Sequence, residues 1–339
     1  MLPSLAVAAA LRERGVTVTF AGSPDRVEAR LVPEAGYELD TFEISGFPRR
    51  PSVELVRSLI RAGRAPRACA AILKRRRPHV VLGGGGYVAG PMVYAAWRRK
   101  VPAALTEADA HLGLANRLAA PFARRVFLAY EIPGRDGAKY RVTGRPVPDE
   151  HRGVSQAEGR RRFGLPESGP VLAFFGALAG ARSLNDFAVE TYGDAGPAVL
   201  HVSGERDYER LRAQVHRDDY VLVPSTNDFG AALAAPDLAV SRAGGTVWEL
   251  AASGTPSVLV PYPHATSDHQ MLNARHFERG GGVVVVPESE LERVPGIVAE
   301  LLADPSRLAS MRTAMLAMAR PEAADEIAEE LIALASAGR

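Results

Sequence analysis

The sequence has a single cysteine among its 339 residues, Cys69. One cysteine excludes an intramolecular disulfide and fits the reducing cytoplasm. The chain also lacks any run of about 18 apolar residues, the length that a membrane-spanning helix needs. Its opening segment, MLPSLAVAAALRERG, is too short and has no basic start, which argues against a signal peptide. We therefore expect a cytoplasmic chain built of globular domains.

Several motifs of nucleotide and metal chemistry are also absent. There is no G-x-x-x-x-G-K-[ST], which excludes a P-loop, and no clean G-x-G-x-x-G followed by an acid, which disfavours a dinucleotide oxidoreductase. Neither H-E-x-x-H nor an Asp-x-Asp pair occurs, so the usual acidic holder of a metal beside a sugar-nucleotide diphosphate is missing. We therefore expect no metal and no cofactor.

The charge is balanced overall but uneven along the chain. The formal net charge of +2 argues neither for nor against a nucleic-acid partner, and we predict none. The segment 57–78, RSLIRAGRAPRACAAILKRRRP, is strongly basic, contains no acid and interleaves apolar residues. Such a segment is typical either of a face that meets an anionic membrane or of a solvated basic helix.

Short valine-rich runs alternate with longer segments of helical period. Runs that are apolar on both faces indicate strands of a buried parallel sheet joined by right-handed helical crossovers. The sequence therefore predicts an α/β protein with two doubly wound, Rossmann-like halves. The predicted strands are 16–22, 79–84, 101–107, 124–130, 139–144, 171–176, 198–204, 220–225, 237–244, 257–262 and 282–288.

The predicted boundary between the halves is the segment 143–153, TGRPVPDEHRG, which is rich in proline and charge. We predict an N-terminal domain over 1–145, a C-terminal domain over 146–320 and a closing helix over 321–339. That last segment has proline at its start and glycine near its end, as helices commonly do. We expect it to pack back toward the N-terminal domain.

Three glycine-rich turns follow predicted strands, at 83–91, 175–181 and 243–246. Ligands of open α/β sheets bind beyond the carboxyl ends of strands, where a glycine turn and a helix N-terminus accommodate phosphate. One such turn commonly serves only packing. Three of them, spread over both halves, favour a ligand that lies between two Rossmann-like domains.

The third turn and the loop after the next strand carry the most chemistry. Gly244, Gly245 and Thr246 offer amides and a hydroxyl to an anion, and Glu249, three residues on, suits a ribose diol or is simply a capping acid. The following loop holds several polar side chains, which suit the hydroxyls of a sugar, or are capping and surface residues. Two histidines among them leave a metal site as a weaker interpretation. These side chains are His264, Asp268, His269, Gln270 and Asn273.

Here the chain resembles a known family, MurG, a bacterial glycosyltransferase. The segment SRAGGTVWELAASGTPSVLVPYPHATSDHQMLNA resembles the family's donor-binding segment, and PHVVLGGGGYVAGPMVYAAW resembles its acceptor-side glycine loop. The segment 3–47 resembles the family's opening helix and second strand. The resemblance implies a GT-B fold, in which two Rossmann-like domains flank a cleft. It also implies transfer of N-acetylglucosamine from UDP-N-acetylglucosamine to lipid I, with inversion, at the cytoplasmic face of the cell membrane. The implied partners are the donor, a lipid-linked acceptor and an anionic inner-membrane surface.

The same resemblance implies roles for individual residues. Donor contacts fall on Thr226, near the uracil, on the Gly244–Thr246 turn facing the diphosphate, on Glu249 at the ribose, and on His269 and Gln270 at the sugar. Arg242 is a further expected donor-site residue. Acceptor contacts fall on Gly84, Gly85, Gly86, Tyr87 and Asn116. The general base is expected to be Glu107 or His264. The donor turn named above consists of Gly244, Gly245 and Thr246.

Several motifs depart from the family pattern. The family's HEQN reads TEAD at 106–109, its GGSQGA reads GALAGA at 176–181 with Leu178 in place of serine, and its GNPVR reads GRPVP at 144–148. The family's first strand and GGTxGH loop have no counterpart before Pro3, and we expect the gene to start upstream of Met1. Three alternatives therefore stay open: a related GT-B transferase with another lipid or natural-product acceptor, a UDP-sugar epimerase, and a non-catalytic UDP-sugar-binding homologue.

Overall fold

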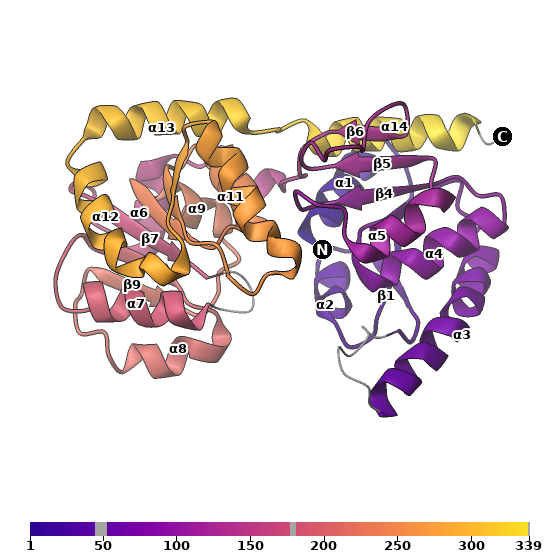
Figure 1. The fold of residues 1–339 in the computed structure, drawn as a ribbon, viewed down its shortest axis with the longest axis horizontal. Coiled ribbons are helices and arrows are strands. Elements are labelled where there is room, and N and C mark those ends of the chain that lie inside the picture. Colours follow the sequence, from indigo (N-terminus) through magenta and orange to yellow (C-terminus); the bar gives the residue numbers. More distant parts are fainter. Residues whose placement is uncertain (45–52, 177–180, 338–339) are drawn as a thin grey trace. The chain divides into compact units, whose positions relative to one another are not determined.

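The computed structural model describes residues 1–44, 53–176 and 181–337, and it divides the chain into two compact units (Figure 1). One unit joins Met1–Pro146 to the C-terminal segment Arg320–Arg339, and the other spans Val147–Ala319. Both are α/β units with parallel sheets, so the predicted fold class is confirmed.

The N-terminal unit consists of short parallel strands and the helices that connect them. Its elements are α1 (Leu2–Glu13), β1 (Thr19–Gly22), α2 (Val27–Glu34), β2 (Glu38–Thr41), α3 (Val53–Arg76), β3 (Val81–Gly83), α4 (Gly86–Arg98), β4 (Ala103–Glu107), α5 (Leu114–Ala119), the 3-10 turn η1 (Ala120–Phe122), β5 (Arg125–Leu128), β6 (Tyr140–Val142) and α14 (Ala323–Ala337).

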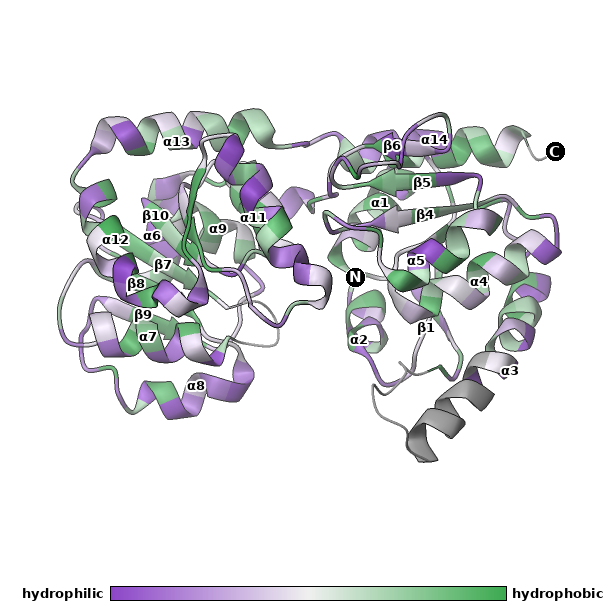
Figure 2. Cartoon of the chain, in the orientation of Figure 1, coloured by the Kyte–Doolittle hydropathy of each residue, from purple (hydrophilic) through white to green (hydrophobic). Residues whose placement is uncertain are grey.

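Helices α1 and α14 pack together over one face of the strands. Both hydropathy colours run along α14, because Ile327, Leu331 and Leu334 recur at helical spacing and bury one face (Figure 2). These side chains form one core with Val7 and Leu11 of α1 and with Phe127 of β5. Ion pairs add to this contact at its edge, where Arg14 meets Asp325 at 2.8 Å. The C-terminal helix is therefore part of the N-terminal unit.

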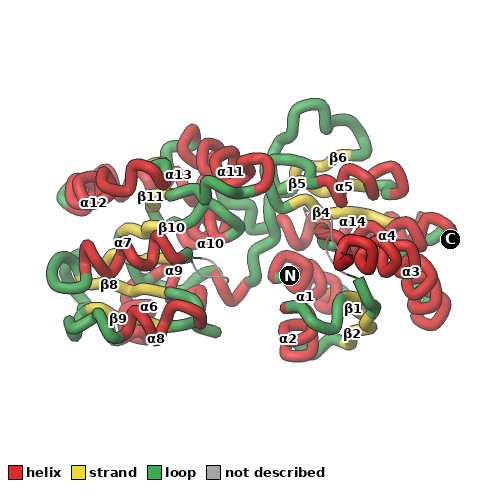
Figure 3. The backbone as a smooth tube through the Cα atoms, turned by 60° about the horizontal axis from the view of Figure 1, so that its bottom comes forward, coloured by secondary structure: helices red, strands yellow, loops and turns green. Residues whose placement is uncertain are grey.

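The strands of this unit form two sheets. Strands β3, β4, β5 and β6 form a four-stranded parallel sheet, whereas β1 pairs with β2 alone among the described strands (Figure 3). Strand β2, with the sequence ELDT, was not predicted because half of its residues are acidic and it has no apolar run. Its Asp40 is nevertheless buried, because Arg76 and Arg75 bind its carboxylate.

The C-terminal unit is a six-stranded parallel sheet in the order β12-β11-β10-β7-β8-β9. Its elements are the 3-10 turn η2 (Asp149–His151), α6 (Gln156–Phe163), β7 (Val171–Phe175), α7 (Arg182–Tyr192), β8 (Ala198–Val202), α8 (Glu205–Arg212), β9 (Tyr220–Val223), α9 (Phe229–Ala234), β10 (Leu238–Ser241), α10 (Thr246–Ser253), β11 (Ser257–Leu259), η3 (Thr266–Asp268), α11 (His269–Arg279), β12 (Val283–Val285), η4 (Glu288–Arg293), α12 (Val294–Leu302) and α13 (Pro305–Met318).

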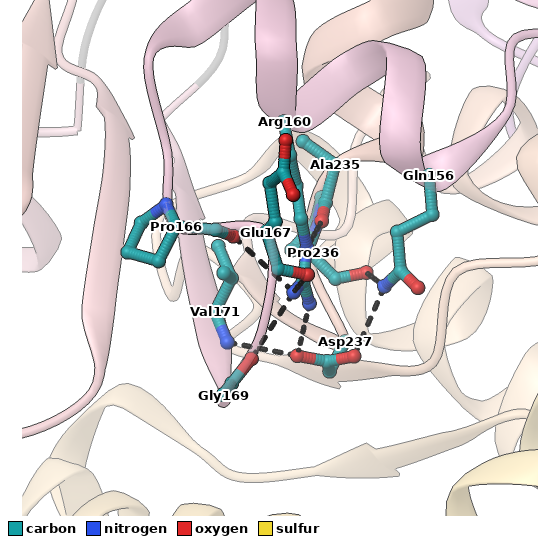
Figure 4. Close-up of polar contacts among 9 residues, drawn as sticks. All are labelled: Gln156, Arg160, Pro166, Glu167, Gly169, Val171, Ala235, Pro236 and Asp237. Atoms are coloured by element: carbon teal, nitrogen blue, oxygen red, sulfur yellow. Dashed lines mark hydrogen bonds and ion pairs between the residues drawn. The ribbon is translucent and has the colours of Figure 1, made fainter.

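The two edges of this sheet differ in what they carry. At the amino edge, the buried guanidinium of Arg160 on α6 binds Asp237 at 2.8 Å and the carbonyl oxygens of Ala235, Glu167 and Gly169 (Figure 4). Asp237 also accepts the backbone N–H of Val171, so this network fixes the start of β7 beside the start of β10. The carboxyl edge is thereby left to the loops that hold the predicted ligand residues.

Among the residues that the structure describes, no helix is long and apolar enough to cross a membrane.

Candidate functional site

The glycine turn at 243–246 leads directly from β10 into α10. Gly245 is the N-cap, and Thr246 is the first helical residue. No N-cap side chain caps this helix, because the N-cap residue is a glycine. The amides of Val247 and Trp248 donate within this turn to the carbonyl oxygens of Gly244 and Gly245. The described backbone leaves the amides of Gly244, Gly245 and Thr246 for a ligand or water, and the helix dipole favours an anion there.

The polar loop after β11 lies against this glycine turn. A side chain at Gly244 would come within 3.9 Å of the Gln270 amide nitrogen, and Asn273 donates to the carbonyl oxygen of Ala243 at 3.1 Å. The Gln270 carbonyl oxygen in turn accepts from the backbone N–H of Tyr262. Strands β10 and β11 are parallel neighbours, so their carboxyl ends bring the two loops together.

The start of α11 has an unusual backbone. Ser267 and Asp268 have φ values of 55° and 52°, in the left-handed region that non-glycine residues seldom adopt. His269, the next residue, donates from Nδ1 to the carbonyl oxygen of Thr266 at 2.8 Å, which orients its ring. Backbone strain of this kind clusters at ligand sites.

His264 sits in the same loop on an exposed stretch. Its described contact is with the Tyr262 ring, at 5.5 Å between ring centroids. No hydrogen bond orients its imidazole within the described part of the chain. Tyr262 thus contacts both His264 and Gln270, and the structure does not fix His264 as a base.

Glu249 lies on the first turn of α10 and is buried. Its Oε1 is 3.1 Å from Nδ1 of His151, a residue of the 3-10 turn that begins the C-terminal unit. Since a carboxylate only accepts hydrogen bonds, Nδ1 carries the proton. The partners lie 98 positions apart in the sequence, so no local pattern links them, and His151 was not among the predicted site residues.

Arg242 is also buried, with 4% of its surface exposed. Its guanidinium forms an ion pair with Glu288 at 2.5 Å. It also donates hydrogen bonds to the Ser183 hydroxyl and to the carbonyl oxygen of Val260. These contacts engage the guanidinium within the C-terminal unit, and the donor contact of Arg242 stays a prediction. Arg242 joins the start of α7 to the loops after β10 and β11.

Thr226 lies in the loop after the edge strand β9, three positions from β10 in the sheet. Its hydroxyl accepts the backbone N–H of Asp228 at 2.9 Å, which fixes the turn into α9. Phe229, the next residue, packs its ring on His151 and Phe175. The loop thus returns from the sheet edge toward Glu249.

Residues 177–180 of the second glycine turn, including Leu178, lie outside the described residues. Its flanks rest on a buried polar network, in which Asn185 of α7 donates to Asp207 and to the carbonyl oxygen of Ser203. The Asn185 carbonyl oxygen accepts from His201, whose other ring nitrogen accepts from Tyr220. Burial lowers the pKa of His201 to about 3, so this histidine is neutral.

On the N-terminal unit, the predicted acceptor loop follows β3. Gly85 and Gly86 have φ values of 87° and 68°, which a residue with a side chain seldom adopts, and Gly86 begins α4. A side chain at Gly84 would come within 2.5 Å of the Ser4 hydroxyl. Tyr87 is half-buried beneath the guanidinium of Arg26. The backbone of this loop is therefore compact and open to close approach.

Glu107 ends β4 and is fully engaged. Its carboxylate accepts hydrogen bonds from the backbone of Ala108, Asp109 and Gly113 and from the amide of Asn116 at 2.9 Å. A carboxylate that already accepts from so many donors has no lone pair aimed at a substrate. The contacts give Glu107 a structural role in the loop and do not support its prediction as a base.

Asn116 has one atom that its neighbours leave unsatisfied. Its amide nitrogen donates to Glu107 and to the carbonyl oxygen of Thr106, whereas its buried carbonyl oxygen has no partner in the described chain. A cavity of about 70 Å³ opens beside this loop, with Ser4, Gly84, Thr106, Glu107 and Gly144 in its wall. The acceptor-side residues are thus gathered in one place within the N-terminal unit.

No cluster of three His, Cys, Asp or Glu side chains suited to a metal occurs in residues 1–44, 53–176 and 181–337.

Comparison with known proteins links both units to one family. The sequence profile of the glycosyltransferase family 28 N-terminal domain matches residues 1–128, and that of the family 28 C-terminal domain matches residues 171–327. A Halothermothrix orenii protein is 33% identical, with 94% of this chain and 91% of that protein covered. A Halorhodospira halophila protein is 39% identical, with 96% and 92% covered. Both are named UDP-N-acetylglucosamine–N-acetylmuramyl-(pentapeptide) pyrophosphoryl-undecaprenol N-acetylglucosamine transferase.

Among solved structures, the crystal structure of Acinetobacter baumannii MurG is similar in fold. Its TM-score is 0.74 at 23% identity, with 98% of this chain and 95% of that chain covered. At that identity the likeness concerns the fold.

Proposed function

Because the chain belongs to the MurG family of UDP-N-acetylglucosamine–N-acetylmuramyl-(pentapeptide) pyrophosphoryl-undecaprenol N-acetylglucosamine transferases, we propose that it catalyses this transfer itself. The donor is UDP-N-acetylglucosamine, the acceptor is lipid I, and the product is lipid II of peptidoglycan synthesis. The observation that carries the proposal is the joined pair of loops after β10 and β11, with the glycine turn, Gln270 and Asn273 in contact.

The proposed donor site divides among these elements. The diphosphate lies at the amides of Gly244, Gly245 and Thr246, the ribose diol at Glu249, and the sugar at His269 and Gln270. Thr226 contributes backbone groups near the uracil, and Arg242 supports the loops from beneath. A buried carboxylate that accepts from a diol suits Glu249, because its contact with His151 occupies one oxygen and leaves the other.

The proposed chemistry is a single inverting displacement. An acceptor hydroxyl attacks the anomeric carbon, its proton passes to a base, and UDP leaves with the electron pair of the broken bond. The N-terminus of α10 stabilises the charge that develops on the leaving diphosphate. Of the two predicted bases, the contacts of Glu107 favour His264.

The acceptor diphosphate is assigned to the glycine loop of the N-terminal unit. The backbone of Gly84, Gly85, Gly86 and Tyr87 leads into the N-terminus of α4, which favours an anion, and Asn116 fixes the neighbouring loop through Thr106 and Glu107. Thr106 and Ala108 replace larger polar residues of the family motif, which is the specific observation that favours a second candidate, a related lipid or natural-product acceptor.

A lipid-linked acceptor calls for contact with a membrane, and we assign it to an apolar-basic patch on α4 and α5. Trp97, Leu114 and Leu118 are exposed by 49%, 62% and 65%, and Trp97 stacks near Phe122 at 5.0 Å. The exposed run Arg98–Lys100 follows Trp97 directly. Exposed apolar side chains beside positive charge suit an anionic lipid surface. The chain would then act as a peripheral protein on the cytoplasmic face.

The basic segment 57–78 contributes only some of its cations to such a surface. Arg75 and Arg76 are bound by Asp40, and Arg76 also meets Glu38, so these cations are neutralised within the fold. The pKa of Asp40 is lowered, chiefly by its hydrogen bond to Arg76. Arg64, Arg67 and Arg77 remain exposed for a lipid surface.

The experiment that tests the function follows radiolabelled UDP-N-acetylglucosamine with and without lipid I. Label that enters lipid only when lipid I is present is expected. Transfer to another lipid acceptor but not to lipid I would support the second candidate. Release of an epimer without any acceptor would identify an epimerase, and UDP binding without turnover would identify a non-catalytic homologue; either result would reject the proposal.

A further inference from the structure

The contact between Glu249 and His151 links the donor helix to the segment that begins the C-terminal unit. Both side chains are buried, with 7% of each residue's surface exposed, and Oε1 of Glu249 accepts the Nδ1 proton at 3.1 Å. Nothing in the fold requires this contact for a sheet or a helix, because His151 lies in a three-residue 3-10 turn. We therefore consider how this contact affects the Glu249 carboxylate.

Three neighbours hold His151 in place. The ring of Phe229 packs edge-on against the imidazole at 5.4 Å between centroids, and the Ser253 hydroxyl donates to the His151 carbonyl oxygen at 3.3 Å. Gly230 permits the approach of α9, because a side-chain carbon there would lie 2.3 Å from the Glu150 carbonyl oxygen and 2.9 Å from His151 Cα. The imidazole is thus fixed by packing before any ligand binds.

The two oxygens of the Glu249 carboxylate differ in what they contact. Oε1 accepts the hydrogen bond from His151, whereas Oε2 accepts none from the described residues. Oε2 is also not among the fully buried side-chain atoms that lack a partner. A single hydrogen bond to Oε1 fixes the rotation of the carboxylate, which is otherwise a broad torsion. The remaining oxygen then presents its lone pairs in one direction.

We propose that His151 is the positioning residue of the donor site, holding Glu249 so that its second oxygen accepts from the ribose diol. This inference rests on the proposed function, since it takes a uridine diphosphate as the ligand. His151 acts through Glu249 rather than on the sugar. The free site is thereby preorganised, which reduces the ordering that binding must otherwise impose.

The test measures the affinities of UDP and of 2′,3′-dideoxy-UDP, which lacks the diol, by calorimetry on the full chain. We expect His151→Leu to weaken UDP about tenfold while leaving dideoxy-UDP unchanged, the size of one hydrogen bond to a charged group. His151→Asn keeps an N–H near the position of Nδ1 and should restore most of the preference for UDP. His216→Leu, an exposed histidine in the same unit, is the matched control and should change neither affinity.

Each outcome decides the matter. If the wild-type chain prefers UDP and His151→Leu keeps that full preference, the positioning role is wrong while the proposed function stands. Equal loss of both ligands in His151→Leu and His151→Asn would show a merely structural residue and overturn the inference. If the wild-type chain binds no UDP, or binds both ligands equally, the ribose assignment fails first and the inference falls with it. Thermal melts of each variant report whether it is folded.

Discussion

At the scale of single residues, buried polar groups of the C-terminal unit are satisfied in defined directions. Tyr220 donates to His201, His201 donates to Asn185, and Asn185 donates to Asp207. The last acceptor is a carboxylate, so every proton in this chain of hydrogen bonds has one possible position. Burial also raises the pKa of Tyr220, which keeps its hydroxyl a donor.

The neutral His201 makes stability depend on pH. Its native pKa is lowered to about 3, whereas an unfolded histidine titrates near about 6.5, so the unfolded state binds more protons as pH falls below that value. The stability that His201 contributes is complete above pH 6.5 and is lost toward pH 3. Between pH 7.5 and 5.5 we expect the wild type to lose about 1.4 kcal/mol more unfolding free energy than His201→Gln. The measurement is urea titration of both proteins at both pH values. An equal change in unfolding free energy for the two proteins would contradict the prediction.

Arg160 gives a second residue-scale prediction (Figure 4). Arg160→Ala removes a buried guanidinium, and with it one hydrogen-bond donor of Asp237 and the donor to several carbonyl oxygens. We expect a loss of about 3 kcal/mol in unfolding free energy by denaturant titration. Arg162→Ala is the matched control, because its pairs with Glu158 and Asp228 are exposed and contribute less than about 1 kcal/mol. Equal losses would show that the buried network has no special weight.

At the scale of elements, glycine sets how closely helices approach. Gly159 lets α6 lie against α9, since a side-chain carbon there would fall 2.5 Å from the Ala231 carbonyl oxygen. Gly159→Ala should therefore lower the unfolding free energy by about 1–3 kcal/mol, although alanine is the better helix former. Gly296 of α12 has open space around it, and Gly296→Ala should raise stability by about 0.5–1 kcal/mol. Thermal unfolding that moves in the same direction for both variants would refute this account.

The elements also show what the sequence could predict. Every predicted strand range contains a strand. The pattern is clearest for β7, β10 and β11, whose apolar runs are buried on both faces of a parallel sheet. Strand β2 was missed because an edge strand with acidic residues has no such pattern, and its Asp40 is buried only through arginines some 35 residues away. The approach of the glycine turn to Gln270 was predictable, since loops after neighbouring parallel strands share one sheet edge.

The rest of the candidate site depends on contacts that no sequence pattern records. His151 and Glu249 meet across 98 residues, and Arg242 is buried by Ser183 and Glu288 from two other elements. Glu107 had the residue type and the sequence position expected of a general base. Only the fold reveals that its carboxylate is occupied by the backbone of its own loop. Residue identity therefore does not reveal which partners engage these side chains.

At the scale of the whole molecule, the apolar-basic patch predicts how the chain meets lipid. Replacing Trp97 and Leu118 by serine should weaken binding to vesicles of anionic phospholipid about tenfold, and binding should fall as salt rises. Val27→Ser, an exposed apolar residue of α2 in the same unit, is the control and should bind as the wild type does. Vesicle sedimentation that shows salt-independent or unchanged binding would return the patch to an ordinary surface.

The central claim concerns the whole chain, a transferase whose donor site lies in the C-terminal unit. Its most direct test compares labelled N-acetylglucosamine transfer to lipid I by the wild type and by Glu249→Ala, at equal folded protein. We predict labelled lipid II with the wild type and a loss of kcat/KM of about ten- to a hundredfold in the variant, from the missing ribose contact. Failure of the wild type to label lipid, or transfer by Glu249→Ala at the wild-type rate, would contradict the account.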